Sequence, residues 1–157
     1  MLRKNDPSEG LQWNLFTPRI EEEIDPHHPL VILADEIPWP SIEKQFQHGY
    51  ARRGRPGKSI RMMVGFHFLQ RLFDLSEERL VSQWCQEPSW QYLCGMAFFD
   101  TTPPLERSAL PHWRKRFGQE TLEMAIMRII QAGEACSILH YQDQKLSLLD
   151  DEGSAVP

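Results

Sequence analysis

One long apolar segment, residues 59–75 (SIRMMVGFHFLQRLFDL), constrains the fold of this chain more than any other feature. Ser59 is a residue type that caps helix N-termini, and the apolar side chains after it fill most of a helix surface. A helix that is apolar on most sides needs other elements around it. We therefore expect residues 60–73 to form the most buried helix. His67 lies among these apolar residues, which favours a satisfied core histidine over a catalytic or ligand role.

Further helix signals stand on both sides of this segment. Leu30 to Ile37 is apolar enough for a short buried helix that Pro38 ends, and residues 41–48 favour another. Ser76 is placed to cap a helix directly after the central one, and residues 90–94 and 108–117 favour further helices. A final amphipathic helix is expected over residues 119–135. The prediction is an all-α fold: a compact helical bundle of about six helices, with a helix-turn-helix-like cluster.

The helical signals also divide the chain. Residues 1–29 mix charges with four prolines and predict an extended N-terminal arm, while residues 30–135 form the helical domain. Residues 136–157 predict an irregular, disordered tail, in which only residues 145–149 show a weak strand-like alternation. The core positions most sensitive to truncation are expected to be Val64, Leu72, Leu80, Trp84 and Trp90.

A basic arm stands directly before the central segment. Between Glu43 and Asp74 the chain has seven Lys or Arg residues and no acidic residue, although its formal net charge is −5. Such a cationic segment in an acidic chain favours a polyanionic partner. Short Arg- and Gly-rich loops are also common as plain solvated connectors, and charge alone leaves both readings open. The candidate nucleic-acid contacts here are Arg52, Arg53, Arg55, Lys58 and Arg61.

A second cationic group lies in the helix expected over residues 108–117. Its candidate nucleic-acid contacts are Arg114, Lys115 and Arg116. Because these residues sit at the C-terminal end of the helix, a favourable interaction with the helix dipole is a sufficient structural explanation for them. We therefore expect this group to contribute less to DNA binding than the arm.

Several function classes lack support in the sequence. The chain has no Gly-rich phosphate loop, no GxSxG or HExxH motif and no Cys/His pair at a useful spacing, so we predict no catalytic residues, no metal site and no cofactor. Its three cysteines have no CxxC spacing and are expected to be reduced core thiols. The absence of a signal peptide or a membrane-length apolar run predicts a cytoplasmic protein without membrane contact.

Three stretches together carry a resemblance. They are LADEIPW at residues 33–39, the run from Ala51 to Gly95, and SALPHWRKRFG at residues 108–118. In this order they resemble the N-terminal domain of bacterial insertion-sequence transposases of the InsH-like group, over about residues 30–135. The resemblance implies a helical DNA-recognition domain that precedes an RNase H-like catalytic domain with an Asp-Asp-Glu metal triad.

The chain departs from the family pattern after Cys136. Asp150 or Asp151 is a candidate for the first catalytic Asp, but no place remains for the other two carboxylates, so the chain is expected to be a truncated transposase without cleavage chemistry. The implied partner is DNA at the terminal inverted repeats of a transposon. A homodimer, or a heterodimer with intact transposase, is a second kind of partner that stays open. The alternative to DNA recognition is thus a helical interaction module that pairs through its apolar faces.

Overall fold

The computed structural model of this chain describes residues 17–50, 57–150 and 153–156. In chain order its elements are α2 (Ile20–Glu23), α3 (Pro29–Glu36), α4 (Trp39–Phe46), η1 (Gln47–Gly49), α5 (Ile60–Phe73), α6 (Glu77–Trp84), α7 (Pro88–Leu93), α8 (Ala109–Phe117), α9 (Gln119–Ala135), β1 (Leu139–Gln142) and β2 (Lys145–Leu148). The predicted all-α class is confirmed. The described residues form eight α-helices rather than about six, and they also form a small two-stranded sheet.

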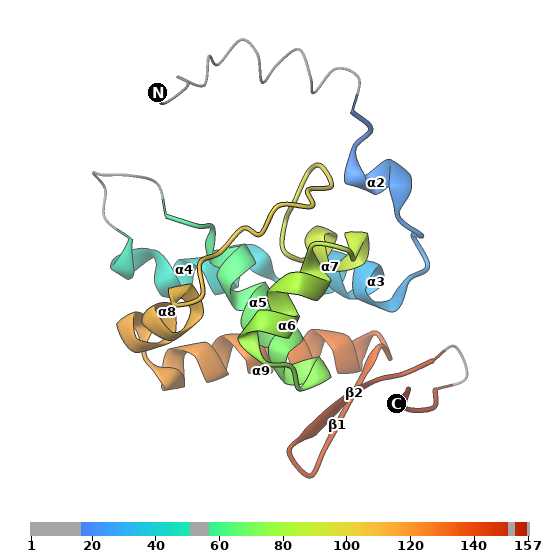
Figure 1. Cartoon of the computed structure of the whole chain (residues 1–157). Helices are drawn as coiled ribbons and strands as arrows, with labels where there is room; N and C mark the ends of the chain where they lie inside the picture. Colours follow the sequence, from blue (N-terminus) through green and yellow to red (C-terminus); the bar gives the residue numbers. More distant parts are fainter. Residues whose placement is uncertain (1–16, 51–56, 151–152, 157) are drawn as a thin grey trace.

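Helix α5 is the centre of the bundle (Figure 1). The Ser59 hydroxyl accepts from the Met62 N–H at 3.1 Å, which is the predicted N-cap. Asp74 ends the helix in the left-handed conformation, with φ 50°. Helices α4 and α8 pack on one side of α5 and α7 on another, while α9 runs along the bundle. The eight successive residues from Met62 to Leu69 are all buried, as expected for a helix that is apolar on most sides.

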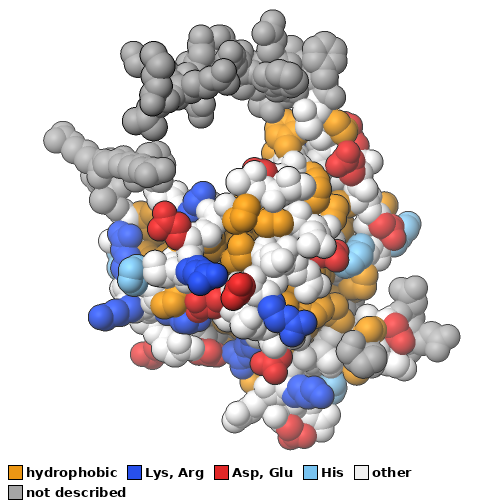
Figure 2. All heavy atoms as spheres, in the orientation of Figure 1, with side chains coloured by type: hydrophobic (Ala, Val, Ile, Leu, Met, Phe, Trp, Pro, Cys, Tyr) orange, Lys and Arg blue, Asp and Glu red, His pale blue; other side chains and the backbone are white. Residues whose placement is uncertain are grey.

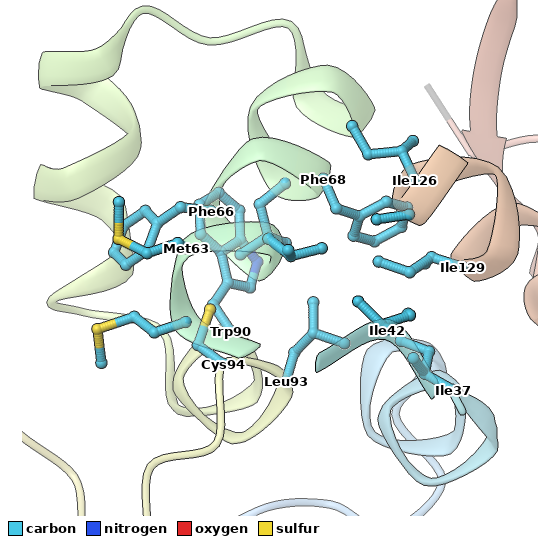
Figure 3. Packing of buried hydrophobic residues seen from close by; sticks show 14 of the residues in the cluster. Ile37, Ile42, Met63, Phe66, Phe68, Trp90, Leu93, Cys94, Ile126 and Ile129 are labelled. Carbon is cyan, nitrogen blue, oxygen red and sulfur yellow. The ribbon is translucent and has the colours of Figure 1, made fainter. Parts of the chain in front are cut away.

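The core forms one continuous cluster around α5. Figure 3 shows Phe68 of α5 beside Ile126 and Ile129 of α9, while Phe66 lies toward Trp90 of α7. Four of the five predicted core positions are buried: Val64, Leu80 and Trp84 at 0% exposure and Trp90 at 3%. Leu72 is only partly buried, because it lies near the end of α5, where fewer elements surround the helix.

The tail differs from the prediction. Residues 139–148, expected to be disordered, form an antiparallel hairpin in which Leu139 faces Leu148 and Gln142 faces Lys145. Leu139 and Leu146 are buried, since β1 packs on α9 and β2 packs on α5. A β-carbon on Gly133 of α9 would come within 2.3 Å of the Leu139 side chain, so the absence of that carbon makes room for the hairpin. Burial of two leucines against the bundle therefore orders this part of the tail.

The described part of the predicted N-terminal arm is also attached to the bundle. Ile20 in α2 is fully buried and its N–H donates to the Ala97 carbonyl at 2.9 Å. Glu21, Glu22 and Glu23 after it are exposed, as expected for a charged run. An extended arm is thus not the structure of residues 20–23, because one apolar anchor fixes a helical turn against α7.

Candidate nucleic-acid interface

The predicted DNA contacts fall into three groups in the structure. Arg52, Arg53 and Arg55 lie outside the described residues. Lys58, Lys115 and Arg116 are exposed. Arg61 and Arg114 are only partly exposed and are engaged with the protein itself. Figure 2 shows Lys and Arg side chains gathered on the side of the molecule where α4 and α8 lie in Figure 1.

Tyr50 connects the two cationic segments. Its hydroxyl donates to the Lys58 carbonyl at 3.0 Å and accepts from Trp113 Nε1 of α8 at 3.1 Å. Its ring stacks on Phe117, with ring centroids 5.6 Å apart and planes 23° apart. Residues on both sides of 51–56 therefore meet at one side chain, and that side chain rests on the C-terminal half of α8. We call the contacts among Tyr50, Lys58, Trp113, Arg116 and Phe117 the Tyr50 clasp.

Two glycines allow this close approach. A β-carbon at Gly49 would lie 2.1 Å from the Phe117 ring, so a larger residue would have to displace that ring. A β-carbon at Gly57 would lie 3.2 Å from the Tyr50 ring, a contact tighter than usual. In the sequence these glycines indicate only a flexible connector. In the structure they bring both ends of the connector against the aromatic end of α8.

Arg116 belongs to the Tyr50 clasp and is nevertheless exposed. Its guanidinium donates to the Gly49 carbonyl and lies 5.5 Å from the centre of the Tyr50 ring and 5.3 Å from that of Phe117. Cation–π contacts of this kind hold the flat face of a guanidinium while leaving hydrogen-bond donors at its edge. Lys115 beside it is exposed, and both stand in the last turn of α8, where the helix dipole favours cations. Lys58, Lys115 and Arg116 are thus all exposed, and the Lys58 backbone and the Arg116 guanidinium both meet at Tyr50.

Arg61 has a structural role in the bundle. Its Nε donates to the Leu93 carbonyl at 2.9 Å and its Nη2 to the Tyr92 carbonyl at 3.0 Å. Both carbonyls belong to the last turn of α7, where intrahelical donors run out, and the Tyr92 carbonyl also accepts from the Gly95 N–H at 3.0 Å. The guanidinium also lies 4.9 Å from the centre of the Trp39 ring, and burial lowers its pKa from the usual value. Arg61 thus joins α4, α5 and α7.

Arg114 is similarly engaged. Its Nη2 pairs with the Glu77 carboxylate of α6 at 2.9 Å, and its Nη1 donates to the Gln70 side chain at 3.4 Å. Both members of the ion pair are about 30% exposed, at 32% and 29%. A phosphate would have to compete with this carboxylate for the guanidinium. The structure therefore separates Arg114 from its neighbours Lys115 and Arg116, although the sequence groups all three.

Sequence reasoning missed Tyr50, Trp113 and Phe117 as members of this surface. The only local signal was an aromatic residue directly before the basic arm and two aromatics interleaved with the cations of residues 113–117. Aromatic side chains at such positions more often belong to a core. Trp113 and Phe117 are indeed buried, at 6% and 8% exposure, so they support the surface from below.

The tail carboxylates do not form a metal site within the described residues, where no three His, Cys, Asp or Glu side chains lie close enough together to hold an ion. Asp150 instead organises a turn: its Oδ1 accepts from the Ser154 N–H at 2.7 Å, and its carbonyl accepts from the Gly153 N–H at 2.9 Å. Asp151 lies outside the described residues. No helix in the described ranges is both long and apolar enough to cross a membrane.

Comparisons with known proteins place the chain among transposase domains. Residues 18–116 match the sequence model of the family described as Transposase domain (DUF772). A protein of Rhizobium meliloti named "Uncharacterized protein ORF8 in nfe locus" is 38% identical over 131 residues, which are 83% of this chain and 63% of that protein. The chain thus spans less than two thirds of this relative's length. No solved structure matches. Because the family match covers more than half of the sequence, this chain belongs to the transposase domain family DUF772.

Proposed function

We propose that this chain is the DNA-binding part of an insertion-sequence transposase of the InsH-like group and recognises transposon ends. The Tyr50 clasp carries the proposal. It joins the residues flanking 51–56 to the basic end of α8, and Lys58, Lys115 and Arg116 stand exposed around it. Arg52, Arg53 and Arg55 follow Tyr50 within five residues in the sequence, so this segment of the chain carries three further cations. A phosphate backbone is the partner that such a concentration of cations favours.

We assign the DNA contacts to the basic arm and to α8 rather than to α6. In a helix-turn-helix arrangement the N-terminal residues of the second helix approach the bases. Helix α6, which follows α5 after a short turn, begins with Glu77 and Glu78. Carboxylates at that position would repel the phosphates on either side of a groove. The predicted helix-turn-helix-like cluster is therefore assigned a packing role. Arg52, Arg53 and Arg55, which precede α5 in the sequence, are assigned to a DNA groove or to the phosphate backbone.

We assign no cleavage or joining of DNA to this chain, because that chemistry would need two divalent ions held by three carboxylates. The proposed protein partners are a second copy of the chain or an intact transposase, and only the intact transposase would supply the cleavage chemistry. A groove of about 830 Å³ between the end of α5 and the hairpin favours such contacts as the second candidate function. Phe73 and Val156 line it and are 36% and 47% exposed.

Salt dependence of duplex DNA binding tests the proposal. On duplex DNA each neutralised phosphate contributes about −0.9 to the slope of log affinity against log salt. Replacing Arg52, Arg53 and Arg55 together by Ala is expected to flatten the slope by about two to three units, with far-UV circular dichroism unchanged. Salt-insensitive self-association with no DNA binding would favour the interaction module. If the triple variant is folded and keeps its affinity and salt slope, the arm does not contact DNA and is only a connector.

A further inference from the structure

The residue at the centre of the Tyr50 clasp carries no charge and is the one that both cationic segments touch. The Tyr50 hydroxyl has a donor and an acceptor function, and both are used: the proton goes to the Lys58 carbonyl, and an oxygen lone pair receives the Trp113 N–H. Trp113 is buried and cannot reach a ligand, so this bond fixes the hydroxyl from inside the protein. The other bond fixes the backbone of Lys58, immediately before the N-cap of α5.

We infer that Tyr50 is a positioning residue for DNA binding, which holds Lys58 in the place where its ammonium group and the cations of α8 engage the same phosphate backbone. This inference rests on the proposed function. It adds that the uncharged hydroxyl of Tyr50 sets how much of the free protein is ready to bind, while the charges set the salt dependence.

The affinity for DNA depends on the fraction of free protein that is in the binding-competent state. If DNA binds the state in which Lys58 is held on Tyr50, the observed dissociation constant equals the intrinsic constant divided by the fraction of free protein in that state. A neutral hydrogen bond contributes roughly 0.5–1.5 kcal/mol to such an equilibrium, which corresponds to about a two- to tenfold change. The loss of the hydroxyl removes no charge, so the number of released counterions stays the same.

The Tyr50→Phe variant isolates this effect. It keeps the ring that packs against Phe117 and beneath Arg116 and removes only the hydroxyl. We expect the affinity of the full chain for duplex DNA to fall about two- to tenfold, with an unchanged salt slope. The matched control is Tyr141→Phe, which removes a hydroxyl that accepts from Arg71 at 3.2 Å on the hairpin. This control is expected to keep the affinity of the original chain.

A double-mutant cycle with Lys58→Ala separates positioning from direct contact. If Tyr50 acts through Lys58, the Tyr50→Phe change has little further effect once the lysine side chain is gone. An equal loss of affinity with and without Lys58 would overturn the inference, because the hydroxyl would then act on DNA independently. Unchanged affinity of Tyr50→Phe in a DNA-binding chain would overturn the inference alone. Absence of salt-dependent DNA binding in the original chain would overturn the proposed function as well.

Discussion

Two places where helices meet in the bundle each contain an arginine, but the two arginines have different surroundings. At the start of α5, Arg61 is enclosed by α4 and α7 and donates to two helix carbonyls. At the end of α8, Arg116 lies on aromatic rings but remains exposed. Both residues stand in sequence segments without acidic neighbours, and both were predicted to contact DNA. A basic segment can therefore contain both structural and surface cations. Whether an arginine is structural or exposed depends on the hydrogen-bond acceptors and rings that surround it in the fold.

The largest effect is expected from Arg61→Ala. The substitution removes the two hydrogen bonds to the Leu93 and Tyr92 carbonyls and the contact with Trp39, and only the Tyr92 carbonyl keeps a second donor, the Gly95 N–H. The free energy of unfolding should therefore fall by about 2–3 kcal/mol. Urea unfolding measures this change. DNA affinity of the folded variant should change less than about twofold, with an unaltered salt slope. Arg79→Ala, an exposed cation of α6, is the control and should be near neutral. A stable Arg61→Ala chain whose salt slope is flattened by about 0.9 would show that Arg61 contacts a phosphate instead of stabilising the bundle.

The Lys115→Ala/Arg116→Ala double variant is expected to act on binding instead. If both side chains meet phosphates, the salt slope should flatten by about 1.8, which is less than the loss expected for the three arm arginines. The stability change should stay within about 1 kcal/mol, because both side chains are exposed. Arg79→Ala/Arg107→Ala removes the same charge from the side of the molecule near α6 and serves as the control. An equal flattening in the control would show that only the total charge matters.

A smaller effect, which depends on pH, concerns the buried His67 of α5. Its ring lies 5.4 Å from that of Trp113, and its Nδ1 lies 2.7 Å from the Met63 carbonyl. Burial, opposed by that carbonyl, lowers the pKa of His67 below its usual value of 6.5. The folded state then binds fewer protons than the unfolded chain below about pH 6.5, so stability is lost as the pH falls through that value.

The His67→Gln variant tests this pH dependence, because glutamine cannot titrate there. Urea unfolding at several pH values between about 5 and 7 should show a flatter decline for this variant than for the original chain. His140→Gln, on the exposed face of the hairpin, should retain the original decline. Identical pH profiles for His67→Gln and the original chain would place the acid sensitivity elsewhere in the protein.

Much of the helical framework could be predicted because its signals are local. The central helix was expected over residues 60–73 and the last one over 119–135, and α5 and α9 have these bounds. The hairpin was missed because its short alternating pattern is weak by itself. Leu139 and Leu146 become buried only against α9 and α5, so the gain that orders them lies outside their own segment.

The candidate site was predicted in part. Lys58, Lys115 and Arg116, which the sequence indicates as candidate DNA contacts, are exposed in the structure, and their contact with DNA stays a prediction. The sequence could not distinguish Arg114 from Lys115, because only the position of Glu77 on a neighbouring helix does so. Nor did it indicate Tyr50, whose partner Trp113 is 63 residues away.

The sequence by itself determined that this chain is helical, that α5 is its centre and that basic residues gather in two segments. These properties follow from helical periodicity, capping residues and charge, which act over a few neighbouring residues. Only the tertiary structure decided that the two segments meet at Tyr50 and that Arg61 is bound to the end of α7. Both outcomes depend on hydrogen bonds between residues more than 30 positions apart, 63 for Tyr50 and Trp113 and 32 for Arg61 and Leu93. Such contacts form only when packing brings distant helices together.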